Sequence, residues 1–177
     1  MPLELTRNAA LWRNGLSDES FVVTIGGREA ENAQDEEGAA NLTEAAIFQA
    51  SCSLGQAIGL FAVDVKSNWS SEQMRGALAA LELARTDGIV KFAGLACCAA
   101  QILKSVWQDH DGFEFVLMPW DRWTQESSDL CKQRGAAGVA LYDETPHQAQ
   151  SMASINLIGV RSSNDIAQLS KQSGTDC

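Results

Sequence analysis

The chain has 177 residues, of which 45% are hydrophobic and 20% are charged. This length suits one domain with one sizeable core, and the composition excludes a chain that is disordered throughout. The formal net charge of −10 argues against non-specific binding to nucleic acid or to an anionic membrane, because both need a basic surface. We expect an N-terminal arm over residues 1–20, a single α/β domain over 21–172 and a frayed tail over 173–177.

The apolar segments and the cysteines indicate where the protein resides. The first residues lack the apolar core of a signal peptide, so we expect none. The longest apolar stretch, from Ile89 to Trp107, contains Lys91 and Lys104, which favours a buried helix over a membrane span. The five cysteines include no C-x-x-C pair, and with two histidines they give no zinc-binding spacing. These features are typical of a soluble protein of the reducing cytoplasm.

The first half of the domain carries two strand signals and one helix signal. The strands are expected where apolar and β-branched residues stand beside glycines or polar residues. Asn41 and Glu44 have capping-box spacing, which predicts the start of a helix. The expected elements are a strand over 21–25, an acidic surface loop over 28–40, a helix over 42–54 and a buried strand over 58–65.

The second half continues the alternation. Ser70 and Gln73 form a second capping box, and Asp121 is expected to cap a helix that ends at Gly135. The expected elements are a helix from Ser70 to Arg85, an apolar helix over 89–108, a strand over 113–118, a helix from Asp121 to Gly135, strands over 138–142 and 154–160, and a helix over 165–171. Strands that alternate with helices predict an α/β fold with a mixed sheet flanked by helices.

The most suggestive polar residues lie at the end of the expected strand 58–65. Side chains alternate along a strand, so Asp64 and Lys66 project to one face and Val63 and Val65 to the other. At a strand end, a carboxylate can bind a divalent metal, and an ammonium can orient an attacking water or stabilise charge on a phosphate. A solvated ion pair without chemistry is the alternative.

This arrangement resembles the core of the restriction-endonuclease-like nucleases, whose motif combines an Asp with Asp or Glu-x-Lys. The resemblance rests on Asp64-Val65-Lys66, the polar turn and the amphipathic helix that follow, and it covers residues 41–142. It implies a metal-dependent nuclease, or a catalytically degenerate relative, that acts on nucleic acid. It implies Asp64, Lys66 and Glu44 as catalytic residues, with Asp64 and Glu44 as ligands of Mg²⁺.

A second hypothesis is an acidic protein-binding module with no catalytic activity. The net charge and the acidic residues 28–37 suit an inhibitor, immunity or adaptor protein that binds a basic protein partner. This hypothesis predicts a contiguous negative face and an association that weakens with salt. The sequence leaves a homo-oligomer open and gives no reason to expect a membrane partner.

Three tryptophans support a third hypothesis. Trp69 follows Lys66 at the expected turn, and Trp120 and Trp123 follow the strand expected over 113–118. Ligands of α/β proteins bind at strand ends, and tryptophan is enriched in interfaces. The three residues are therefore candidates for an interface or a ligand site, and a closed pocket between them would favour small-molecule binding or a different enzyme. Half-buried packing is the alternative.

Overall fold

A computed structural model of the protein describes residues 23–66, 69–142 and 155–158. Within these ranges six strands form one sheet, in chain order, and every neighbouring pair is parallel. The strands are β1 (Val23–Gly26), β2 (Ile58–Asp64), β3 (Val90–Ala96), β4 (Phe115–Pro119), β5 (Ala137–Tyr142) and β6 (Ile155–Ile158). The helices are η1 (Arg28–Asn32), α2 (Glu36–Leu54), α3 (Ser71–Thr86), α4 (Ala100–Asp109), η2 (Trp120–Arg122) and α5 (Gln125–Arg134).

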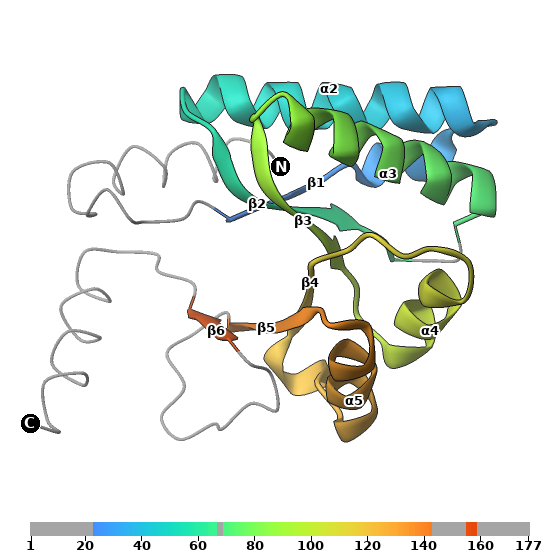
Figure 1. Ribbon diagram of the computed structural model, residues 1–177, viewed down its shortest axis with the longest axis vertical. Coiled ribbons are helices and arrows are strands. Elements are labelled where there is room, and N and C mark those ends of the chain that lie inside the picture. The colour runs from blue at the N-terminus through green and yellow to red at the C-terminus, as the bar shows by residue number, and fades with distance from the viewer. Residues whose placement is uncertain (1–22, 67–68, 143–154, 159–177) are drawn as a thin grey trace, which may run out of the picture.

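The four α-helices connect successive strands and lie along the outside of a curved sheet (Figure 1). Parallel neighbours need a long crossover, because the chain must return to the starting edge before the next strand begins. Crossovers of one hand place every connecting helix on the same face of a sheet whose strands follow chain order. The sheet therefore has an outer face under helices and an inner face without them in the described part of the chain.

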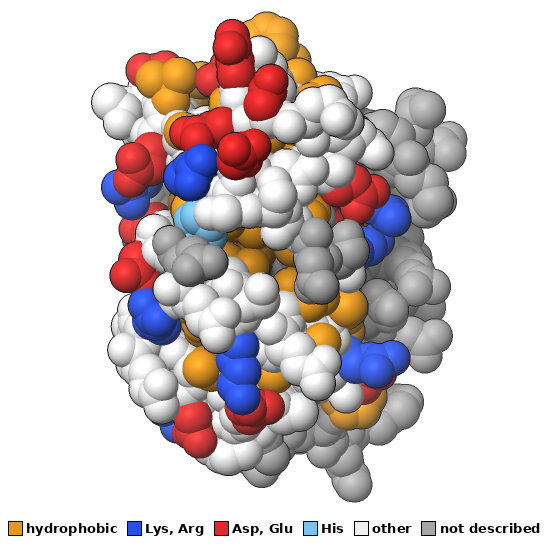
Figure 2. Space-filling view, turned by 90° about the vertical axis from the view of Figure 1, so that its right-hand side faces the viewer, with side chains coloured by type: hydrophobic (Ala, Val, Ile, Leu, Met, Phe, Trp, Pro, Cys, Tyr) orange, Lys and Arg blue, Asp and Glu red, His pale blue; other side chains and the backbone are white. Residues whose placement is uncertain are grey.

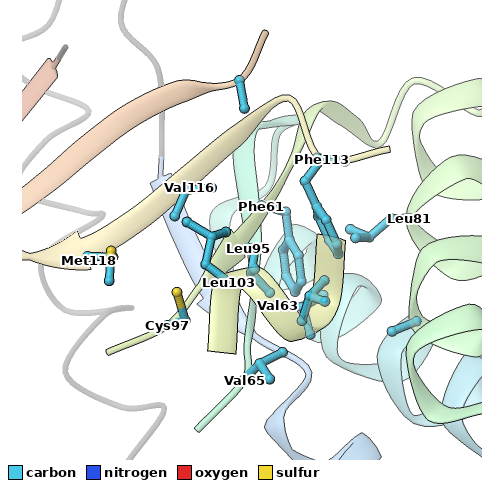
Figure 3. Packing of buried hydrophobic residues seen from close by; sticks show 14 of the residues in the cluster. Phe61, Val63, Val65, Leu81, Leu95, Cys97, Leu103, Phe113, Val116 and Met118 are labelled. Carbon is cyan, nitrogen blue, oxygen red and sulfur yellow. The ribbon is translucent and has the colours of Figure 1, made fainter. Parts of the chain in front are cut away.

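The main core lies between the outer face of the sheet and the helices. Phe61, Val63 and Val65 of the β2 segment are fully buried there, together with Leu81 of α3 (Figure 3). Ile47 of α2 belongs to the same cluster. Full burial of side chains of this size contributes about 1.5–3 kcal/mol each relative to exposure. The alternation along β2 fixes which of its residues meet the helices, as the sequence predicts.

The inner face carries a second and smaller apolar cluster. Its buried members are strand residues only: Ala62, Ala96, Phe115, Leu117 and Val139. Small and large side chains alternate across this face. A Cβ added at Gly94, for example, would lie 2.2 Å from the Phe115 ring. The inner face is thus apolar along its middle, and its polar residues lie toward the strand ends.

The α/β class is confirmed, but the prediction of a mixed sheet is wrong, since all described strand pairs are parallel. The expected helix over 89–108 is also wrong, because residues 90–96 form β3 and only residues 100–109 form α4. Most of β3 is buried, and a short apolar run of this kind cannot be distinguished from a buried helix by periodicity. The break falls at Cys97 and Cys98, which were expected inside a helix.

The helix before β2 begins earlier than its capping box predicts. Asp35 is the N-cap of α2 and accepts a hydrogen bond from the Gly38 amide at 2.7 Å, so Asn41 and Glu44 lie within the helix. The expected loop over 28–40 is therefore wrong for most of its length, since η1 and the first turn of α2 occupy it. Acidic residues in a first turn stabilise a helix through its dipole, which explains why a charged run is helical here.

Other local predictions are confirmed. Ser70 and Gln73 form a complete capping box, with bonds of 3.1 Å and 2.8 Å, and α3 follows. Gly135 ends α5 with a φ of 67°, as expected for a left-handed cap, although Thr124 rather than Asp121 caps the start of that helix. The expected arm 1–20, helix 165–171 and tail 173–177 lie outside the described residues. No helix in the described ranges is long and apolar enough to cross a bilayer.

The closest approach of α2 and α3 depends on Gly76. A Cβ at this position would lie 2.1 Å from the backbone oxygen of Glu36 and 2.8 Å from the Ala40 amide nitrogen, and neither backbone atom can rotate away. We predict that Gly76→Ala lowers the free energy of unfolding by about 3 kcal/mol, at the upper end for overpacking. Urea denaturation measures this change.

The matched control is Gly88→Ala. Nothing lies within 4 Å of a Cβ there, so only the left-handed backbone at φ +72° opposes the substitution, at about 1 kcal/mol. Equal losses for the two variants would show that α2 and α3 are not in such close contact.

Candidate functional site

The carboxyl ends of all described strands lie at one edge of the sheet, because every pair is parallel. In barrels and open sheets of this kind, ligands bind at that edge. Polar and aromatic residues follow several of the strands there. They are Arg28 after β1, Asp64 and Lys66 at the end of β2, Cys98 after β3, and Trp120, Asp121 and Arg122 after β4.

Asp64 and Lys66 form an ion pair at the end of β2. The Lys66 Nζ lies 3.4 Å from the Asp64 Oδ2, and the Asp64 side chain is 20% exposed whereas that of Lys66 is 51% exposed. Asp64 is the last residue of the strand and, by alternation with Val63, belongs to the inner face. The extended backbone therefore brings the acid and the amine together, as the sequence predicts.

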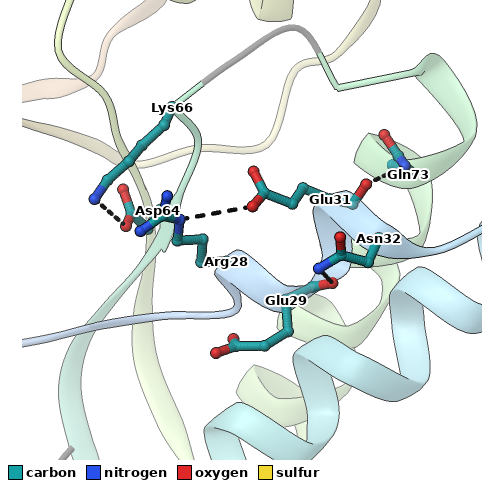
Figure 4. Close-up of polar contacts among 7 residues, drawn as sticks. All are labelled: Arg28, Glu29, Glu31, Asn32, Asp64, Lys66 and Gln73. Atoms are coloured by element: carbon teal, nitrogen blue, oxygen red, sulfur yellow. Dashed lines mark hydrogen bonds and ion pairs between the residues drawn. The ribbon is translucent and has the colours of Figure 1, made fainter. Parts of the chain in front are cut away.

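A second ion pair lies beside the first. Arg28 follows the left-handed Gly27 at the end of β1, and its Nε lies 3.7 Å from the Glu31 Oε1 (Figure 4). Because Gly26 pairs with Val63 across the two strands, Arg28 and Lys66 leave the sheet at neighbouring positions. The edge thus presents two half-exposed cations, each held loosely by one carboxylate.

Glu44 lies far from this cluster in the fold. It is exposed on α2, in the outer helical layer, whereas Asp64 belongs to the inner face of the sheet. A sheet layer thus separates the two carboxylates that the nuclease resemblance assigns to one metal. Among the described residues, no group of three or more His, Cys, Asp or Glu side chains could hold a metal ion.

The three candidate tryptophans occupy different environments. Trp123 is buried, its ring covers Gly138, and its Nε1 donates to the Val139 carbonyl oxygen at 3.3 Å. Trp69 is half-buried against the main core, and its buried Nε1 has no hydrogen-bond partner among the described residues. Trp120 is 45% exposed directly after β4. Of the three, Trp120 therefore presents the most accessible ring at the strand edge.

The N-terminus of α4 lies at the same edge and differs from those of the other described α-helices. Its N-cap is Ala99, which makes no side-chain capping bond, and its first turn contains no acid. By contrast, Asp35, Ser70 and Thr124 cap α2, α3 and α5. First-turn amides without a cap and the positive end of the helix dipole favour a negatively charged group. No pattern in the sequence indicates this helix start, because the apolar run from Ile89 predicts one longer helix through it.

Two cysteines, Cys97 directly after β3 and Cys131 on α5, are shielded from solvent. Burial raises the pKa of the Cys97 thiol to about 12 and that of the Cys131 thiol to about 11. Cys52 and Cys98 are exposed thiols. Since the thiolate is the reactive form, the buried pair is chemically inert at neutral pH.

No known protein family matches the sequence, and no curated protein is similar to it. Solved structures share its fold. The holo form of aldo-keto reductase AKR11C1 from Bacillus halodurans matches 98% of this chain and 72% of its own length, with a TM-score of 0.67 at 11% identity. The aldo-keto reductase MGS-M4 from a Medee basin deep-sea metagenome library matches 78% of this chain and 50% of its own, with a TM-score of 0.57 at 16% identity.

A third similar structure is the aldo-keto reductase AKR2E4 from Bombyx mori in complex with NADP. It matches 75% of this chain and 45% of its own length, with a TM-score of 0.53 at 20% identity. At identities this low, the likeness shows that the chain has the barrel-type α/β fold of these enzymes.

This likeness corrects the predictions of family and function. The expected restriction-endonuclease-like fold is wrong, because the matching structures are aldo-keto reductases. The described strands of this chain are all parallel and follow chain order, in keeping with that correction. A nuclease and a non-catalytic acidic binding module are both contradicted, since the neighbours are oxidoreductases. The expected Mg²⁺ is contradicted too, because the carboxylates Asp64 and Glu44 lie in separate layers and the described residues form no metal site.

The buried thiols give a testable dependence on pH. The folded-state pKa of Cys97 lies above its ordinary value of 9.0, so its burial as a thiol stabilises the fold below pH 9. That contribution is lost as the pH rises from about 9 toward 12, because in this range the Cys97 thiol ionises in the unfolded chain but not in the folded one.

We predict that iodoacetamide at pH 8 modifies Cys52 and Cys98 but not Cys97 or Cys131, as measured by peptide mass spectrometry. Rapid modification of Cys97 in the folded protein would contradict its burial.

Proposed function

We propose that the chain is an oxidoreductase that uses NADP(H) to reduce a carbonyl group. The observation that carries the proposal is the match of 98% of the chain to an aldo-keto reductase in its holo form, with a TM-score of 0.67. A related enzyme with the same fold is solved in complex with NADP. The charged strand edge gives this fold a site where such chemistry can occur.

The described residues fit an anionic dinucleotide. Its phosphates need cations or free amides, and Arg28 and Arg122 offer side chains that are 52% and 64% exposed at the strand edge. The uncapped start of α4 adds backbone amides at the same edge. The apolar inner face suits a flat ring, because its nearest buried residues, Ala96 and Leu117, carry no polar groups.

When bound, the reduced nicotinamide supplies a hydride to the carbonyl carbon. The carbonyl oxygen then needs a proton, and the Lys66 Nζ is the donor that we assign to this step. Asp64, 3.4 Å away and mostly shielded, holds the ammonium at the inner side of the edge. A donor fixed in this way contributes typically about 10²–10⁴-fold to the rate.

The buried strand that carries Asp64 supports this assignment. Asp64 extends from a strand whose preceding residues, Ala62 and Val63, are fully buried, so its carboxylate is anchored on a rigid element. The buried apolar cluster of the inner face lies on one side of the edge and offers no polar side chain that would compete for the proton. The free thiols at Cys52, Cys97, Cys98 and Cys131 suit a reducing compartment, and we propose the cytoplasm as its location.

We predict that Lys66→Ala lowers kcat for NADPH-dependent reduction of 4-nitrobenzaldehyde by about 10²-fold or more, because the proton donor is lost. The dissociation constant of NADPH should rise by no more than about tenfold, since one exposed cation among several is removed. Consumption of NADPH, followed by absorbance, measures the rate, and quenching of tryptophan fluorescence measures binding.

Lys132→Ala is the matched control, because Lys132 is an exposed lysine on α5 and should leave both quantities unchanged. A full-length protein that does not bind NADPH or NADP⁺ at millimolar concentration would refute the proposed function. Binding and turnover that survive in Lys66→Ala would refute only the role of Lys66.

A further inference from the structure

The outward face of α2 carries an exposed aromatic side chain in an acidic setting. Phe48 is 67% exposed, the highest value among the large exposed apolar side chains of the described residues. Residues three or four positions apart share one face of a helix, so Phe48 is aligned with Glu37, Asn41, Glu44 and Cys52. All five are exposed, and we call them the α2 ridge.

The surface beside the α2 ridge also combines exposed apolar side chains with carboxylates. Gly76 brings α3 against the first turns of α2, and both helices run in the same direction because each precedes a strand of one parallel sheet. Leu83, two turns beyond Gly76, therefore lies abreast of the middle of α2, and it is 52% exposed. Figure 2 shows apolar groups separated by carboxylates at the top of the molecule, over these helices.

The charges of this surface restrict what it can bind. Glu37 and Glu44 flank the aromatic side chain on its N-terminal side, and neither makes an ion pair within the described residues. Glu36 is already engaged by Arg75 at 2.8 Å and does not add to the free charge. A second copy of the chain would add another net charge of −10, and an anionic membrane would be repelled as well.

We propose that the α2 ridge docks a basic amphipathic helix of a partner protein, with Phe48 as the apolar anchor and Glu37 and Glu44 as the contacts for lysine or arginine. A helix that places leucines against Phe48 and cations one turn away would match both features of the ridge. The ridge lies in the outer helical layer, whereas the reaction is assigned to the strand edge. This inference therefore does not depend on the proposed function.

The test uses the full chain and an 18-residue synthetic helix of leucine and lysine with a fluorescent label, followed by anisotropy at low salt. We predict that Phe48→Ala weakens binding about tenfold or more, because a central anchor is removed. Glu44→Gln should weaken binding about two- to fivefold and make it less sensitive to salt. Because Phe48 and Glu44 are exposed, both variants should retain the circular dichroism spectrum of the unaltered protein.

Two matched controls separate the ridge from the general acidity of the chain. Leu42→Ala removes a less exposed apolar side chain from another face of α2, and Asp129→Asn removes one negative charge from α5. Neither should change binding by more than about twofold. Phe48→Ala binding as tightly as the unaltered protein, or equal binding of a leucine and glutamate helix, would overturn the proposal. Self-association that depends on Phe48, seen by light scattering, would assign the ridge to a second copy instead.

Discussion

Parallel pairing in chain order constrains this structure more than any other feature. Each pair of neighbouring strands needs a crossover that returns the chain to the starting edge, and α2, α3, α4 and α5 lie in the four crossovers between β1 and β5. Because crossovers have one hand, all four helices cover the same face of the sheet. The same constraint brings the carboxyl ends of all described strands to a single edge, where Arg28 and Lys66 become neighbours although they are 38 residues apart in the sequence.

The two faces of the sheet are packed in different ways. On the outer face, long side chains such as Phe61 and Leu81 fill the space between sheet and helices. On the inner face no helix of the described chain is present, so strand residues must cover one another. Gly94 leaves the room that the Phe115 ring occupies, and Gly138 does the same for Trp123 on the outer side. These glycines serve close packing rather than unusual backbone geometry.

Local chemistry in the sequence predicted the elements whose ends carry their own signals. The Ser70 capping box and the Gly135 cap are satisfied within a few residues of chain, so no long-range contact decides them. The apolar segment after Gly88 carries no such signal. Its residues Val90–Ala96 become a strand because β2 and β4 lie on either side, and only the fold supplies those partners. The parallel direction of the sheet likewise depends on the crossovers and cannot be derived from the strands alone.

For Asp64 and Lys66, the geometry predicted from the sequence is correct, but the metal site inferred from it is wrong. Alternation along β2 is a local rule, and it placed the acid and the amine together as expected. A metal site needs further ligands from other elements, and their position depends on the layers of the fold. Glu44 is on the outer helical layer, so the carboxylate at the strand end has an amine beside it rather than a second acid. An isolated acid and amine cannot form the ligand set of a divalent cation, but they can orient and deliver a proton. The same two residues therefore suit the proton transfer of the proposed carbonyl reduction, and the arrangement of the layers rules out the metal site.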